Sequence, residues 1–97
     1  MAALAGAVFL GKRKKITHDP ANVPYIILGT GLLWFGWFGF NAGSALAANA
    51  DAVIAFANTN IASATAMITW MFYERFRNRK MSAVGACIGA IVGLVAI

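Results

Sequence analysis

The chain has 97 residues, of which 61% are hydrophobic and 11% are charged, and its mean hydropathy is +0.74. An average soluble domain carries roughly 25% charged residues, so this composition excludes an ordinary soluble domain and indicates an integral membrane protein. The net charge of +5 does not indicate a nucleic-acid partner, because no binding module or stacking platform surrounds the basic residues.

The first apolar segment, residues 1–11, is too short to cross a bilayer, which takes roughly 20 residues. We therefore expect it to be the end of a membrane span. A signal peptide is the alternative, but its basic residues would precede the apolar run, whereas here they follow it. Residues 12–22 are predicted to form a polar loop.

The next segment, residues 23–48, contains no charged residue and is long enough to cross a bilayer with some tilt. Asn22 is placed to cap this helix, and Pro24 falls in its first turn, where the missing N–H costs nothing. Residues 49–51 are predicted to form a short turn, with Asp51 as the cap of the following helix.

A second charge-free run, residues 52–73, is predicted to return across the membrane and complete a helical hairpin. Residues 74–81 are predicted to form a second polar loop, and residues 82–97 to begin a further span. Short loops rich in Lys and Arg stay on the cytoplasmic side, so both polar loops are predicted to be cytoplasmic and the turn at 49–51 to lie outside. The basic residues occupy these two loops: Lys12, Arg13, Lys14, Lys15, Arg75, Arg77, Arg79 and Lys80.

These segments predict an all-α membrane protein with two full transmembrane helices and two partial ones. The two short spans lead us to expect that the chain is an internal part of a larger multi-pass protein. The single cysteine, Cys87, excludes an internal disulfide framework. One histidine and one cysteine, without a spaced ligand cluster, predict no metal site, and no cofactor is indicated.

Small residues recur every fourth position in two of the spans, which predicts close contact between helices. The two rows are Gly85, Gly89, Gly93 and Gly39, Gly43, Ala47. The second span also carries polar side chains, which we expect to bond to neighbouring helices or to their own backbone, with the lining of a polar pathway as the alternative.

Phe40 and Ser44 are the candidate site residues. Four residues apart on one helix, they lie on one face, one turn from each other, in the outer half of the span. An aromatic ring attracts a cation to its face, and a hydroxyl oxygen replaces a lost water ligand, so the pair is suited to a small cation. The alternatives are ordinary helix packing for Phe40 and a bond to its own helix for Ser44.

The sequence resembles the ammonium transporter family (Amt/Mep/Rh) over nearly its whole length. The resemblance is carried by NVPYIILGTGLLWFGWFGFNAGSALAAN, AFANTNIASATAMITWMFYE and SAVGACIGAIVGLVAI, and it extends back through GAVFLGKR. It implies a fragment of an eleven-helix fold made of two inverted halves, from the end of the fifth helix to the start of the eighth. It also implies a homotrimer with a pore in each subunit, in the cell membrane.

By the same resemblance, Phe40 matches a phenylalanine of the outer gate, and Ser44 matches the hydroxyl that contacts ammonium in the outer vestibule. Asn41 is expected to shape and pack the helix rather than touch substrate. The paired pore histidines of the family have no counterpart among these residues. His18 is instead expected to be a solvated loop residue.

The resemblance implies ammonium transport: ammonium is recruited at an outer vestibule and deprotonated, and ammonia passes through an apolar pore. Potassium has no proton to lose and is rejected at this step. The expected partners are ammonium or ammonia, membrane lipid, the other subunits of the trimer and a cytoplasmic regulatory protein, and no enzymatic activity is expected. The alternatives are an ammonium sensor of the same family and a small membrane scaffold that does not transport.

Overall fold

The structure is a computed structural model that describes residues 1–12, 14, 19–77 and 80–97. Every regular element in these ranges is a helix: α1 (Ala2–Leu10), α2 (Val23–Gly43), α3 (Ala50–Phe76) and α4 (Ala83–Val95). The prediction of an all-α fold is therefore confirmed. His18 lies outside the described residues, as do Arg13, Lys15 and Arg79 of the basic clusters.

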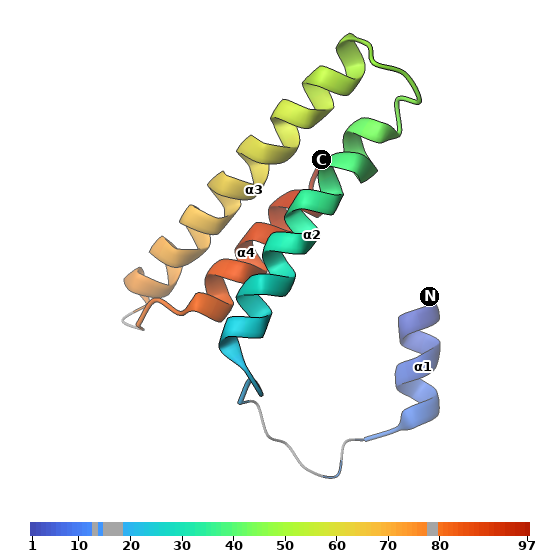
Figure 1. The fold of residues 1–97 in the computed structure, drawn as a ribbon. Coiled ribbons are helices and arrows are strands. Elements are labelled where there is room, and N and C mark those ends of the chain that lie inside the picture. Colours follow the sequence, from blue (N-terminus) through green and yellow to red (C-terminus); the bar gives the residue numbers. More distant parts are fainter. Residues whose placement is uncertain (13, 15–18, 78–79) are drawn as a thin grey trace.

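Helices α2, α3 and α4 pack against one another, and the contact between α3 and α4 is the most extensive (Figure 1). Helix α1 stands apart from these three. Helices α2 and α3 are both long and apolar enough to cross a membrane, while α4, with 13 residues, is shorter.

Polar side chains define where the three packed helices begin. Asn22 Oδ1 accepts a hydrogen bond from Tyr25 N at 3.2 Å, which confirms the cap expected for α2. Helix α3 begins at Ala50, and its cap is Asn49, whose Oδ1 accepts from Ala52 N at 3.0 Å. The expectation of an Asp51 cap is therefore wrong. Asp51 instead lies in the first turn, where the helix dipole favours its negative charge.

Helix α2 ends at Gly43, five residues before the end of the charge-free run at Ala48. The chain then turns through hydrogen bonds from Ala45 N to Ala42 O (3.2 Å) and from Leu46 N to Gly43 O (3.0 Å). Leu46 has a φ of 54°, in the left-handed region that ends a helix. The charge-free run therefore extends beyond the end of α2 into the loop that connects α2 to α3.

Helix α4 approaches α3 closely along its glycine row. A Cβ atom at Gly93 would lie 2.5 Å from Ser63 Cα, and one at Gly89 would lie 2.8 Å from Trp70 Cβ. Ser63 is fully buried at this contact, and its Oγ donates to Ala90 O at 2.8 Å. The row at 85–93 therefore forms a helix contact as predicted, whereas Cβ atoms at Gly39 and Gly43 would meet no described atom.

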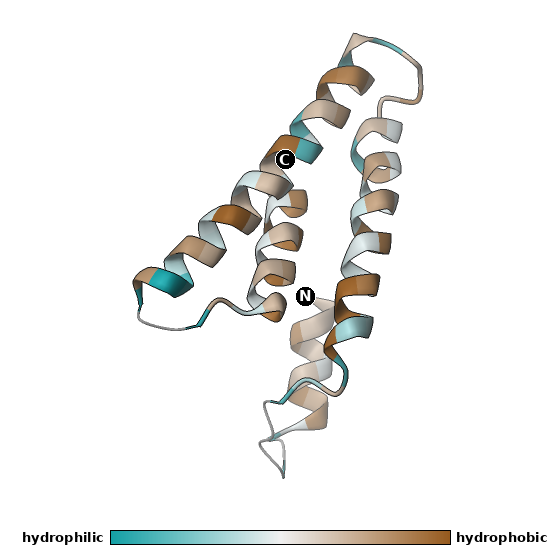
Figure 2. Ribbon diagram, turned by 60° about the vertical axis from the view of Figure 1, so that its left-hand side comes forward, coloured by the Kyte–Doolittle hydropathy of each residue, from teal (hydrophilic) through white to brown (hydrophobic). Residues whose placement is uncertain are grey.

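Large hydrophobic side chains cover the outside of the helices, and the small core contains Cys87, Ala90 and Leu94. In Figure 2 the hydrophobic colour follows the helices, and the hydrophilic colour lies at turns, at helix ends and at one patch within α3. An apolar exterior of this kind is stable against lipid or further helices, not against water.

Candidate functional site

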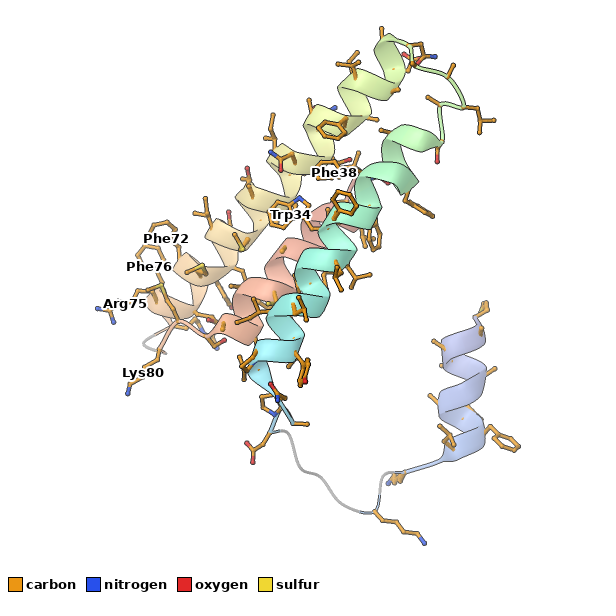
Figure 3. All side chains as sticks on the ribbon, in the orientation of Figure 1. Trp34, Phe38, Phe72, Arg75, Phe76 and Lys80 are labelled. Carbon is orange, nitrogen blue, oxygen red and sulfur yellow. The ribbon has the colours of Figure 1, made fainter. Side chains whose placement is uncertain are left out.

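The candidate site lies at the end of α2 that leads into the turn at 44–49. One side of this helix packs on α3. The Phe38 ring stacks on the Phe56 ring with centroids 4.3 Å apart and an angle of 23° between the ring planes. Figure 3 shows Trp34 and Phe38 extending from α2 toward α3.

Asn41 lies on the same side of α2, one turn after Phe38. Its Nδ2 donates to Thr59 Oγ1 at 3.0 Å and reaches Leu94 O at 3.4 Å, so a single amide connects α2 to both α3 and α4. Thr59 and Leu94 are fully buried. The sequence identified Asn41 as a packing residue, but nothing in it indicated which side chain would be its partner.

Phe40 points away from this contact. At 100° per residue, its side chain lies about 160° around the helix from Phe38, and 70% of its surface is exposed. Its ring contacts that of Trp37, with centroids 5.7 Å apart and a tilt of 57°. The two rings line a shallow hollow of about 320 Å³ with Leu32, Leu33 and Gly36.

Ser44 directly follows the last residue of α2, and its Oγ donates to Phe40 O at 2.6 Å. The alternative that Ser44 bonds to its own helix is thus what the structure shows. This bond uses only the hydroxyl proton, so both lone pairs of the oxygen remain able to accept. An acceptor oxygen one turn from an exposed aromatic ring suits a small cation that carries hydrogen-bond donors.

Three other polar side chains of α3, those of Thr59, Ser63 and Thr69, form hydrogen bonds within the bundle. Thr59 Oγ1 donates to Ala55 O at 2.6 Å, and Thr69 Oγ1 donates to Thr65 O at 2.8 Å. With the Ser63 bond to α4, these contacts agree with the expected bonding to neighbouring helices or to their own backbone. In the ranges that the structure describes, no three His, Cys, Asp or Glu side chains gather into a metal-binding group.

Glu74 and Ser82 form a contact that the sequence analysis missed. Ser82 N donates to Glu74 Oε2 at 2.8 Å, while Ser82 Oγ accepts from Gly85 N at 2.9 Å and so caps α4. A serine just before an apolar run was a visible cap signal, but the pairing with Glu74 depends on how the chain turns between α3 and α4. This contact links the end of α3 to the start of α4, at the end of the bundle opposite the candidate site.

Residues 1–97 match the model of the Ammonium Transporter Family. The chain belongs to the ammonium transporter family. This confirms the family resemblance drawn from the sequence, including the motif around Phe40 and Ser44.

Curated ammonium transporters align with the whole of the chain. The ammonium transporter of Aquifex aeolicus is 53% identical over 97 residues, which make up 100% of this chain and 23% of the relative. That of Bacillus subtilis is 50% identical over 98 residues, with 100% of this chain and 24% of the relative covered. That of Mycobacterium tuberculosis is 49% identical over 100 residues, with 100% and 21% covered. The chain thus spans between a fifth and a quarter of the length of these relatives.

Proposed function

We propose that this chain is part of an ammonium transporter and that the outer end of α2 contributes Phe40 and Ser44 to its ammonium site. Family membership supports the transport function. The observation that carries the site is the Ser44 Oγ to Phe40 O bond of 2.6 Å, which holds an acceptor oxygen one turn from an exposed ring.

The proposed mechanism follows from the cost of moving charge through an apolar medium. The ring of Phe40 attracts ammonium, and Ser44 Oγ accepts one of its N–H bonds, so part of the lost hydration is replaced. Ammonium then releases a proton to water in the outer vestibule, before or at Phe40, because neutral ammonia crosses an apolar pore at much lower cost than a cation. Potassium cannot lose a proton and stays outside.

The charge distribution supports an orientation for this proposal. Arg75 and Lys80 lie at the end of the bundle opposite the turn that follows Ser44 (Figure 3). Since short basic loops remain in the cytoplasm, this end faces inward and Ser44 faces outward. We further propose the multi-pass location in the cell membrane, the homotrimer and the cytoplasmic regulatory partner that are implied by family resemblance.

The test uses the full-length transporter that carries this chain, purified and reconstituted in lipid vesicles. Ser44→Ala removes a hydrogen bond to a charged ligand, so KM for ammonium is expected to rise about 10-fold or more. Phe40→Ala removes a cation–π contact, with an expected loss of about 2- to 30-fold in affinity and reduced selectivity over potassium.

Two variants serve as controls. Ser44→Thr keeps the hydroxyl, and Phe35→Ala removes another exposed phenylalanine of α2, so both should retain the KM of the wild type. Unchanged uptake and selectivity in both Phe40→Ala and Ser44→Ala would reject the site. A reconstituted wild type that binds ammonium without moving it would instead support the sensor alternative.

A further inference from the structure

Asn41 occupies an unusual position beside the candidate site. Asn41 directly follows Phe40 in the sequence, but its side chain points toward the other helices and not toward the exposed face of α2. Its amide nitrogen donates to Thr59 Oγ1 at 3.0 Å and to Leu94 O at 3.4 Å. The Thr59 hydroxyl donates its hydrogen bond to Ala55 O at 2.6 Å. Its oxygen therefore acts as the acceptor toward Asn41, as does the Leu94 carbonyl, and the NH₂ group of the amide suits both partners.

This contact constrains the rotation of α2 about its axis more sharply than the neighbouring aromatic stack. Stacked rings such as Phe38 and Phe56 tolerate sliding, whereas a hydrogen bond weakens steeply as its distance and angle change. Side chains reach about 6 Å from a helix axis. A rotation of about 20° would therefore move the Asn41 amide by about 2 Å and break its bond.

The same rotation would displace the candidate site. Phe40 and Asn41 are rigidly related because they are adjacent in one helix, so a shift of about 2 Å at the amide is a comparable shift at the Phe40 ring. Ser44 is tied to the Phe40 carbonyl and moves with it. The interior of a membrane contains no water that could replace the broken hydrogen bond. This favours a single rotation of α2 about its axis.

We propose that Asn41 is a positioning residue: its bond to Thr59 sets the rotation of α2 and so places the Phe40 ring and the Ser44 hydroxyl for ammonium. This inference rests on the proposed function. Asn41 itself touches no substrate and acts through its two neighbours on the exposed face of the helix.

The test compares variants made on opposite sides of the bond in the reconstituted full-length transporter. Asn41→Leu removes the donor, and Thr59→Val removes the acceptor while keeping the shape of the side chain. Each is expected to raise KM for ammonium about 3- to 10-fold, the range expected from one lost hydrogen bond, and to lower selectivity over potassium. The double variant should be no worse than either single variant, because the bond can be lost only once.

Thr69→Val is the matched control, since Thr69 lies on the same helix but donates within it, to Thr65 O at 2.8 Å. It is expected to keep the KM and selectivity of the wild type. Should Asn41→Leu fail to fold, Thr59→Val and the double variant carry the test, because the double variant removes the donor and the acceptor side chain of the Asn41–Thr59 bond together.

The outcomes separate the two proposals. If Phe40→Ala alters KM while Asn41→Leu and Thr59→Val change only the yield or stability of folded protein, Asn41 has a packing role alone and this inference is overturned. If the wild-type protein moves no ammonium, the proposed function falls, and the positioning role falls with it.

Discussion

Gly93→Ala tests how closely α3 and α4 must approach. The added Cβ would lie 2.5 Å from both Ala62 O and Ser63 Cα, about 1 Å inside an ordinary contact. The obstacle is backbone, which cannot rotate aside, so the helices must separate. Separation by about 1 Å would also stretch the Ser63 Oγ to Ala90 O bond of 2.8 Å beyond hydrogen-bonding distance.

The expected cost has two parts. Overpacking destabilises by about 1–3 kcal/mol, and loss of one hydrogen bond between helices in a membrane adds about 0.6 kcal/mol. Gly39→Ala is the matched control, because a Cβ there meets no described atom and the gain in helix propensity is the same. Gly93→Ala should therefore be less stable than Gly39→Ala by about 2–4 kcal/mol.

The assay is unfolding of the purified full-length protein by a denaturing detergent, followed by circular dichroism. Equal unfolding free energies for Gly93→Ala and Gly39→Ala would refute the close approach of α4 to α3. A lower stability for Gly93→Ala alone would support it.

Two smaller effects are expected at other contacts of α4. Ser63→Ala removes the buried bond to Ala90 O and should lower the unfolding free energy by about 0.6 kcal/mol, up to about 1.7; in the same detergent titration, an increase in stability would contradict this role. Ser82→Ala removes the cap on Gly85 N and should destabilise α4 by about 1 kcal/mol. Hydrogen exchange at the Gly85 amide should then become faster, and Ser82→Thr should restore the slow rate; unchanged exchange in Ser82→Ala would argue against the cap.

Local chemistry predicted several features of this chain correctly. Long charge-free runs produced α2 and α3 because an apolar segment without water must satisfy its backbone polar groups internally. Asn22 caps α2 because its side-chain oxygen can accept a hydrogen bond from a free backbone N–H three residues further along the chain. The spacing of Gly85, Gly89 and Gly93 places them on one helix face whatever that helix contacts. The motif containing Phe40 and Ser44, together with the segments that flank it, was enough to recognise the family.

Other features were decided by tertiary structure. The sequence carries two rows of small residues, but only the packing of α4 on α3 shows that the row through Gly93 is a contact. Asn41 and Thr59 lie 18 positions apart, and their bond exists because α2 and α3 cross at that height with one particular rotation. A sequence fixes which side chains share a face, since that depends on helix geometry alone. Which face meets which neighbour depends on the balance of all contacts in the bundle, and this balance also sets where Phe40 points.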